Sequence, residues 1–349
     1  MNVERVRIDV AQGYDVLIGP GLMEKAGEKI AQVHAPCRAA VITDDTVAGL
    51  FGDTVLSSLS GAGFDPVLWA FPHGEQNKTM ETLAAALNFL GENKISRGDL
   101  VVALGGGVPG DLGGFAAAVY CRGIPFVQMP TTLLASVDAS VGGKTAVDLP
   151  SGKNMAGAFH QPLLVLCDTD VIRALPKELI RDGAAEMIKH ALLADENMFS
   201  LLQSGGWGKN VDQIIARNVA IKRDYVIRDE KDQGVRQLLN LGHTFGHAAE
   251  KCSGFTLTHG QGVAMGLAMA ARAAGMDPAP ILDACRAFSL PTACPYTARE
   301  LSEAALSDKK RRDRQITLAL PEAIGRCYLK TVDIAELSAY FAKGTGEAK

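Results

Sequence analysis

Three of the seven histidines of this 349-residue chain, His243, His247 and His259, lie within 17 residues of one another. Neutral imidazole is a common zinc ligand, and a spacing of four residues places His243 and His247 on one face of a helix. Small residues flank all three histidines and leave room for a ligand. A lone histidine is usually structural, but this grouping favours a catalytic metal site.

A carboxylate has to complete such a ligand set, and Glu186 is the candidate. Lys189 follows one helical turn later, so both side chains can face one cleft. An exposed salt bridge is the alternative for this pair. The apolar residues Met187 and Ile188 between them argue against full exposure.

A second candidate site is a glycine-rich turn, Gly105-Gly-Gly-Val-Pro-Gly-Asp111, which follows the apolar residues 100–104 and opens a helix. The pattern G-x-G-x-x-G in this context is typical of dinucleotide binding, because glycines let the backbone approach a pyrophosphate at a helix N-terminus. The usual acidic partner about 20 residues further on is missing. Asp44, which ends an earlier expected strand, could hold a ribose instead, or it could cap the helix that follows.

Basic residues in glycine-rich surroundings suit an anionic substrate. Lys144, Lys153 and Asn154 lie in such surroundings, and Lys222 and Arg236 precede the histidine cluster. The later run Asp-Lys-Lys-Arg-Arg at residues 308–312 is also basic, but a solvated turn is the simpler interpretation for most of it.

Apolar segments alternate with amphipathic ones in the first half of the chain. Strands are expected over residues 3–10, 14–18, 39–43, 66–71, 100–104, 126–129 and 163–167, and helices over residues 46–59, 80–92 and 111–120. The first two strands form a hairpin, and the others have the composition of buried parallel strands. This alternation predicts a Rossmann-like α/β domain.

The pattern changes to apolar spacings of three and four beyond residue 176, which predicts helices. Short strands are expected only at residues 315–320 and 326–329. We therefore predict an α/β Rossmann-like nucleotide-binding domain over residues 1–162. A mainly α-helical metal- and substrate-binding domain is expected over residues 163–349.

Composition narrows the functional class. A net charge of −4 gives no electrostatic reason to expect nucleic acid or an anionic membrane as a partner. Seven scattered cysteines without a C-x-x-C pair fit a reducing cytosol, and residues 1–7 lack the apolar core of a signal peptide. No apolar run approaches the roughly 20 residues that span a bilayer. We expect a cytoplasmic enzyme.

Long ordered segments of the chain resemble the 3-dehydroquinate synthase family, within the sugar phosphate cyclases. They are Gly105-Gly-Gly-Val-x-Gly-Asp-Leu, Pro130-Thr-Thr-Leu-Leu-Ala-x-Val-Asp-x-Ser-Val-Gly-Gly-Lys-Thr, Gly152-Lys-Asn-Met, Gly157-Ala-Phe-His-Gln-Pro and Leu239-Asn-Leu-Gly-His-Thr-Phe-Gly-His. The resemblance covers nearly the whole chain and is densest from Leu104 to Met265. It is far more specific than any single motif.

The resemblance implies a ligand set that differs from the pair favoured by spacing. It makes Glu186, His243 and His259 the ligands of a divalent metal, zinc or cobalt, and His247 an acid/base group that contacts phosphate. Three protein ligands leave positions open for two substrate hydroxyls.

Further roles follow only from the resemblance. The residues implied to bind substrate are Arg122, Asp138, Lys144, Asn154, Lys189, Lys222, Arg236, Asn240, His247 and one of Lys309 or Lys310. Those implied in catalysis are His247, Lys189, Asp232 and Lys144. Those implied to bind NAD are Asp44, Glu75, Lys78, Gly105, Gly106, Gly107, Val108, Asp111, Thr131, Thr132 and Lys153. The resemblance also implies a homodimer in which Arg122 reaches into the neighbouring subunit.

The reaction implied is conversion of 3-deoxy-D-arabino-heptulosonate 7-phosphate to 3-dehydroquinate and phosphate, in the shikimate pathway of aromatic amino acid biosynthesis. NAD oxidises C5, phosphate is eliminated, the same NADH returns the hydride, and an intramolecular aldol addition closes the ring. The alternatives are another sugar phosphate cyclase such as 2-deoxy-scyllo-inosose synthase, a polyol dehydrogenase of the glycerol dehydrogenase kind, or a non-catalytic binding module. Joint retention of Glu186, Lys189, His243 and His259 argues against the last.

Four places depart from the family pattern. Pro109 replaces an apolar residue in the glycine turn, where proline is compatible with entry into a helix. Asp232 stands where a glutamate is usual, and Asp182 replaces a neutral residue near the cofactor. Gln261-Gly262 replaces Glu-Ala after His259, a departure in the surroundings of an implied metal ligand.

Overall fold

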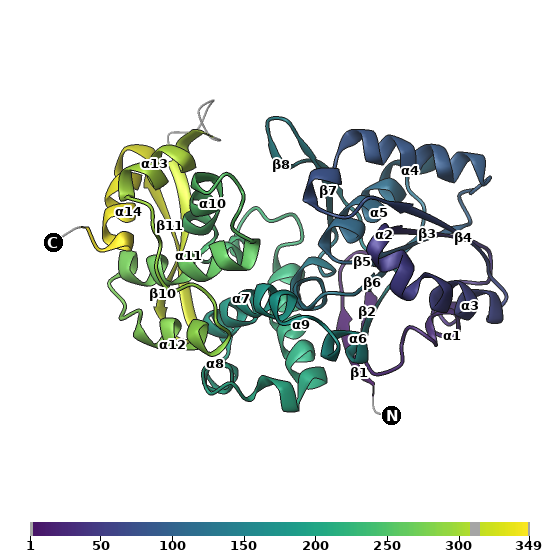
Figure 1. Ribbon diagram of the computed structural model, residues 1–349, viewed down its shortest axis with the longest axis horizontal. Helices are drawn as coiled ribbons and strands as arrows, with labels where there is room; N and C mark the ends of the chain where they lie inside the picture. Colours follow the sequence, from purple (N-terminus) through teal and green to yellow (C-terminus); the bar gives the residue numbers. More distant parts are fainter. Residues whose placement is uncertain (1–2, 308–314, 348–349) are drawn as a thin grey trace. The chain divides into compact units, whose positions relative to one another are not determined.

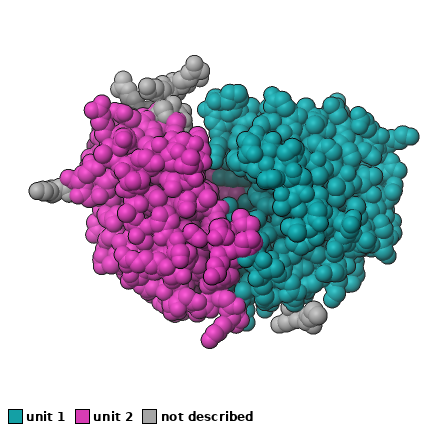
Figure 2. All heavy atoms as spheres, in the orientation of Figure 1, with its two compact units in different colours: residues 1–175, 211–223 teal, residues 176–210, 224–349 magenta. Residues whose placement is uncertain are grey.

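A computed structural model describes residues 3–307 and 315–347 of the chain (Figure 1). The chain divides into two compact units, which Figure 2 distinguishes by colour. The first unit comprises Met1–Leu175 with Val211–Arg223, and the second comprises Pro176–Asn210 with Asp224–Lys349. The boundary expected at residue 162 precedes this division, because the strand that follows it pairs within the sheet of the first unit.

The first unit is built on a seven-stranded sheet in the order β1-β2-β9-β6-β5-β3-β4. The strands are β1 (Glu4–Ile8), β2 (Tyr14–Gly19), β3 (Arg38–Asp44), β4 (Asp65–Phe71), β5 (Leu100–Gly105), β6 (Phe126–Pro130) and β9 (Leu164–Asp168). β1 pairs with β2 in the antiparallel sense that the predicted hairpin requires, and the other pairings in this sheet are parallel. The predicted α/β fold is confirmed.

Helices cover both faces of this sheet, because successive side chains of a strand point to opposite faces. Val41 and Val102 pack with the helices α1 (Ala26–Ala31) and α3 (Asp53–Gly61). Ile42 and Ala103 face the other way and pack with α4 (Met80–Glu92) and α5 (Gly107–Val119). The short helices α2 (Asp45–Val47) and η1 (Ala48–Gly52) lead from β3 into α3.

A small antiparallel hairpin, which the sequence did not predict, is formed by β7 (Lys144–Leu149) and β8 (Gly152–Phe159). β8 is rich in glycine and alanine, and most of its side chains are exposed, so it lacks the apolar alternation that marks a strand. The remaining elements of the first unit are η2 (Glu75–Asn77), η3 (Tyr120–Arg122), η4 (Ala135–Ala139) and α6 (Thr169–Arg173).

The second unit is mainly helical, as predicted. Its elements are α7 (Lys177–Ala194), α8 (Glu196–Gln203), η5 (Gly206–Lys209), η6 (Val235–Asn240), α10 (His243–Cys252), α11 (His259–Ala274), α12 (Ala279–Ala287), α13 (Ala298–Ser307), β10 (Gln315–Ala323), β11 (Arg326–Asp333), η7 (Ile334–Glu336) and α14 (Leu337–Thr345). The expected strands β10 and β11 pair as an antiparallel hairpin. Helix α9 (Val211–Arg228) contributes residues to both units. Across the described residues, no helix is long and apolar enough to cross a membrane.

Candidate active site

Two predicted metal ligands are the first residues of neighbouring helices in the second unit. His243 begins α10 and His259 begins α11, and their ring centroids lie 5.2 Å apart. The two helices approach closely because they meet at glycines. A Cβ atom on Gly266 of α11 would lie 2.0 Å from the carbonyl oxygen of Gly242, so only glycine fits there.

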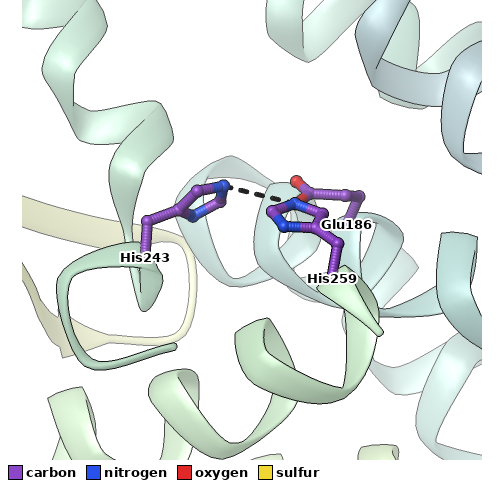
Figure 3. A group of neighbouring side chains, drawn as sticks. All are labelled: Glu186, His243 and His259. Carbon is purple, nitrogen blue, oxygen red and sulfur yellow. Dashed lines mark hydrogen bonds and ion pairs between the residues drawn. The ribbon is translucent and has the colours of Figure 1, made fainter. Parts of the chain in front are cut away.

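Glu186 supplies the carboxylate from the middle of α7, where its side chain is fully buried. Its Oε1 atom lies 3.1 Å from Nε2 of His259 and 3.5 Å from Nε2 of His243. Figure 3 shows both imidazole rings directed toward this carboxylate. One ligand atom from each residue lies within 4.8 Å of the other two. The structure therefore brings together the three residues that the resemblance implied.

The backbone orients the ring of His243. Its Nδ1 atom lies 3.2 Å from the carbonyl oxygen of Leu241. A carbonyl can only accept, so Nδ1–H donates and Nε2 keeps its lone pair on the side of Glu186. Gly242 precedes the helix with a φ of +78°, a left-handed conformation that favours glycine.

The cluster is a buried arrangement of charge. Lys189, which is also buried, forms an ion pair with Glu186 one turn further along α7, so the alternative of an exposed salt bridge does not apply. Burial lowers the pKa of His243 well below its ordinary value and favours the neutral, ligating form. Burial also lowers the pKa of His259, but hydrogen bonds with Glu186 and Glu250 outweigh it and raise that pKa to about 10. Two imidazole nitrogens and one carboxylate oxygen form a donor set of the kind found in catalytic zinc sites, so these residues fit a divalent metal.

His247 does not join His243 at the Glu186 carboxylate, as the spacing of the two histidines had favoured. Its side chain is exposed, and its ring centroid lies 5.2 Å from that of His243 and 5.9 Å from that of His259. The ring that joins His243 at Glu186 is His259. A second group, His247, Glu250 and His259, also has ligand atoms within 4.8 Å of one another.

Predicted NAD-binding residues gather in the first unit at the carboxyl ends of neighbouring strands. Asp44 ends β3, Gly105 ends β5, and Thr131 follows β6. The chain leaves β3 for β4 on one side and returns to β5 on the other, and such a switch point is where open α/β sheets bind ligands. Gly105 has a φ of +148°, and a Cβ atom there would lie 2.5 Å from Cγ of Pro109. This turn, which leads into α5 at Gly107, therefore requires glycine.

Hydrogen bonds fix the backbone around this turn. Thr131 donates its N–H to the carbonyl oxygen of Gly105 at 2.9 Å, and the Thr132 hydroxyl accepts the N–H of Ala135 at 3.2 Å. Asp44 accepts the N–H of Val47 at 2.9 Å, which is the capping role considered for it. The glycine turn and the start of α5 fit a pyrophosphate, because nothing lies within 4 Å of a Cβ atom built on Gly107.

Lys78 joins two sets of predicted residues in the first unit. Its buried ammonium donates to Asp111 Oδ2 at 2.5 Å and to Asn154 Oδ1 at 2.6 Å. Burial lowers the pKa of Lys78, but the carboxylates of Asp111 and Glu75 outweigh it and raise that pKa. Asn154, implied to bind substrate, is thus connected to Asp111, implied to bind NAD. The carboxylate of Asp148 also accepts the N–H of Asn154, at 2.7 Å.

The other implied substrate residues differ in exposure. Lys222 is buried. Its ammonium lies 2.6 Å from the carbonyl oxygen of Asp138 and 3.0 Å from the Asp138 carboxylate. Arg236 is buried and donates to the carbonyl oxygen of Glu230 at 2.7 Å. The exposed residues are Arg122, Lys144 and Asn240. Lys309 and Lys310 lie outside the described residues.

The positions that depart from the family pattern have local explanations. The Gln261 side chain accepts the N–H of Thr258 at 3.0 Å in a capping box at the start of α11. The Asp182 carboxylate accepts the N–H of Gly260 at 2.6 Å, also at the start of α11. Asp232 adopts a left-handed φ of +57°.

Glu250 was not among the predicted site residues. Its buried carboxylate lies 3.3 Å from Nδ1 of His259. Because it follows His247 by three residues and His243 by seven, helical spacing places all three on one face of α10. That spacing could have identified it.

Solved structures define the class of fold. A 2-epi-5-epi-valiolone synthase from Streptomyces hygroscopicus, with NAD+ and Zn2+ bound, is 28% identical with a TM-score of 0.85, over 99% of this chain and 100% of that one. A 2-deoxy-scyllo-inosose synthase complexed with carbaglucose-6-phosphate, NAD+ and Co2+ has the same TM-score at 20% identity, over 98% of this chain and 100% of the other, which shows the fold alone. The fold is that of the sugar phosphate cyclases.

Sequence comparisons define the family. The 3-dehydroquinate synthase N-terminal model matches residues 68–182, and the 3-dehydroquinate synthase C-terminal model matches residues 183–311. A 3-dehydroquinate synthase from Caulobacter vibrioides is 45% identical over 355 residues, which cover 95% of this chain and 96% of that protein. This chain belongs to the 3-dehydroquinate synthase family.

Proposed function

We propose that this protein is a 3-dehydroquinate synthase, which converts 3-deoxy-D-arabino-heptulosonate 7-phosphate to 3-dehydroquinate and phosphate. The observation that carries the proposal is the convergence of Glu186, His243 and His259 in a chain of this family. The activity named for the Caulobacter vibrioides relative supports it.

Glu186, His243 and His259 would hold the metal, and the buried Lys189, which forms an ion pair with Glu186, would hold its carboxylate in place. A divalent metal held by these residues would supply Lewis acidity to the substrate. The Zn2+ and NAD+ in the 2-epi-5-epi-valiolone synthase structure support zinc and NAD as cofactors. The metal that the cell supplies could equally be cobalt, since both ions suit this donor set.

NAD would lie at the glycine turn from Gly105 to Val108, where backbone N–H groups at the start of α5 face the pyrophosphate. Bound there, NAD would supply reversible hydride transfer. Thr131, Thr132 and Asp111 would line this place, and the carboxyl group of Asp44 would contact a ribose. The exposed side chains of Glu75 and Lys153 would complete the set.

Proton transfer and anion binding would fall to this chain's polar side chains. His247 has an exposed ring beside the metal cluster and would exchange a proton with the substrate. Asp232, Lys144 and Lys189 are further proton-transfer candidates. The first unit would bind substrate through Asp138, Lys144, Asn154 and Lys222, and the second through Lys189, Arg236, Asn240, His247 and one of Lys309 or Lys310.

The proposed assembly is a cytoplasmic homodimer in which Arg122 serves the phosphate site of the partner subunit. The exposed position of Arg122 supports this role. Seven free cysteines among the described residues support a reducing compartment.

Subunit mixing tests the shared site. Arg122→Ala and Lys189→Ala should each inactivate the enzyme, and mixing the two variants should restore part of the activity in hybrid dimers. Subunit exchange is confirmed first by native mass spectrometry. Absence of recovery after that exchange would count against a shared site.

One assay separates the proposed activity from its alternatives. The protein with Zn2+ or Co2+ and a catalytic amount of NAD is offered 3-deoxy-D-arabino-heptulosonate 7-phosphate, glucose 6-phosphate or glycerol, and phosphate and NADH are measured. Phosphate release from the heptulosonate alone is expected. Turnover of glucose 6-phosphate would indicate a 2-deoxy-scyllo-inosose synthase, and accumulation of NADH with glycerol would indicate a polyol dehydrogenase.

A further inference from the structure

The carboxylate of Glu250 lies against the side of the His259 ring that faces away from Glu186. Nδ1 of His259 is 3.3 Å from Glu250 Oε1, whereas Nε2 of the same ring is 3.1 Å from Glu186 Oε1. Both carboxylates are buried. The ring is therefore held between two carboxylates, one at each nitrogen.

Glycine provides the space for the Glu250 carboxylate. A Cβ atom on Gly262 of α11 would lie 2.7 Å from Glu250 Oε1 and 2.8 Å from its Cγ, closer than real Cβ contacts come. A Cβ atom on Gly246 of α10 would likewise lie 2.6 Å from the carbonyl oxygen of Gly262. The close approach of the two helices thus allows a side chain of α10 to reach the first residue of α11.

The backbone under His259 is fixed independently of Glu250. Thr258 and Gln261 form a capping box, and Asp182 accepts the N–H of Gly260 at 2.6 Å. These bonds set the position of the His259 Cα atom, but they leave the rotation of its ring undetermined. Glu250 is the group that contacts the ring nitrogen opposite to Glu186 and can determine that rotation.

We propose that Glu250 is a positioning residue, which accepts the Nδ1–H of His259 and holds Nε2 toward Glu186, and that Gly262 makes this contact possible. The inference rests on the proposed metal site. A carboxylate behind a metal-bound imidazole fixes the tautomer and makes the ring a stronger donor, and its loss typically weakens metal binding by about 10- to 100-fold.

Two substitutions disturb the contact in different ways. Glu250→Gln keeps the shape of the side chain and an acceptor oxygen but removes the charge. Gly262→Ala keeps the charge and displaces the Glu250 side chain, and its Cβ atom would also lie 3.1 Å from the carbonyl oxygen of Gly246. Gly208→Ala is the matched control in the same unit, because nothing lies within 4 Å of a Cβ atom built there.

The readout is the affinity of the metal-free protein for Zn2+, measured by competition with a chromophoric chelator, together with the visible spectrum of the Co2+ form. We expect Glu250→Gln and Gly262→Ala each to weaken Zn2+ binding by about 10- to 100-fold and to change the Co2+ spectrum, and Gly208→Ala to do neither. The double variant should bind no more weakly than the weaker single variant, because both changes remove the same contact. Independent structural damage would make the two losses multiply.

Three outcomes separate this inference from the proposed function. If Glu186→Ala binds Zn2+ like the unaltered protein, the proposed metal site is wrong. If Glu186→Ala loses Zn2+ while Glu250→Gln and Gly262→Ala bind it normally, only the positioning role is wrong. If His247→Ala and Glu250→Gln both lose Zn2+ while Glu186→Ala retains it, Glu250 is itself a ligand in the group with His247 and His259, and the positioning role is overturned.

Discussion

The two units hold their candidate binding groups in different ways. In the first unit the glycine turn presents backbone groups from one continuous stretch, which ends β5 and begins α5. In the second unit three side chains from three helices converge, and Glu186 and His259 are 73 residues apart in the sequence. A backbone site can be recognised from a local motif, whereas a side-chain site depends on how helices pack.

The charge distribution also differs between the two regions. Lys78 in the first unit contacts Asp111 and Asn154, so the chain itself provides partners for the buried ammonium. In the second unit two histidines and Lys189 surround the buried Glu186 carboxylate, an arrangement that a metal ion would change. We therefore expect metal and pH to affect the second unit more than the first.

Removal of a metal ligand should have the largest effect, and the effect should be confined to the second unit. His259→Ala should weaken Zn2+ binding by more than the roughly 100-fold that loss of an outer contact costs, and it should abolish turnover. The affinity for NAD, measured by fluorescence titration, should stay unchanged. His247→Ala should retain the metal and lose turnover by about 10²- to 10⁴-fold. If metal analysis finds His247→Ala empty and His259→Ala loaded, the ligand set is wrong.

The raised pKa of His259 predicts a pH dependence confined to the second unit. Protonated His259 stabilises the metal-free fold fully below its ordinary pKa of about 6.5, and this contribution is lost as pH rises through about 10. Metal displaces that proton, so Zn2+ affinity should increase roughly tenfold per pH unit within this window. Isothermal titration in buffers of different ionisation enthalpy should detect the released proton. A flat affinity between pH 7 and 9 would contradict the raised pKa.

The Lys78–Asp111 ion pair tests the contribution of a buried charge in the first unit, where no metal is proposed to bind. Lys78→Met leaves the Asp111 carboxylate without its buried cation and should lower the free energy of unfolding by about 3 kcal/mol. It should also weaken NAD binding. Zn2+ affinity should not change. Lys153→Met, at an exposed lysine of the β7–β8 hairpin, should cost less than about 0.5 kcal/mol. Urea denaturation of both variants provides the comparison, and equal losses would show that burial of Lys78 is energetically unimportant.

Substitutions in the glycine turn should have the smallest effect on stability. Gly105→Ala places a Cβ atom against the rigid ring of Pro109 at a left-handed φ and should cost about 1 to 3 kcal/mol. Gly107→Ala meets nothing within 4 Å in the first turn of α5, so its stability should be unchanged or slightly higher. Both should weaken NAD binding, because both add a side chain beside the pyrophosphate. Stability losses of equal size would show that Gly105 is not required for folding.

The sequence predicted more of the fold than of the site. The strands of the main sheet and α4 were expected within a few residues, because buried strands and amphipathic helices leave clear apolar patterns. β7 and β8 were missed because glycine, alanine and charged residues occupy most of their positions, in place of the β-branched and large apolar residues typical of strands. α5 begins at Gly107 rather than at residue 111, since glycines with a low helix propensity occupy its first turn.

The metal cluster could not be derived from spacing. His243 and His247 are four residues apart on one helix, yet the close packing of α10 on α11 brings His259 to Glu186 instead. The family resemblance supplied the correct grouping of these three residues, while their role as ligands stays a prediction. Gln261 and Asp182 could not be assigned from the sequence, because both act on the backbone at the start of α11.

The central claim is that NAD at the glycine turn and a metal at Glu186, His243 and His259 act as catalysts of one elimination and ring closure. Substrate deuterated at C5 tests it most directly, with NAD well below the substrate concentration. If the hydride leaves and returns to the same carbon, the carbocyclic product keeps deuterium at that carbon, one phosphate is released per product, and no NADH accumulates. Accumulation of one NADH per substrate, with deuterium on the nicotinamide, would contradict the claim and identify a dehydrogenase.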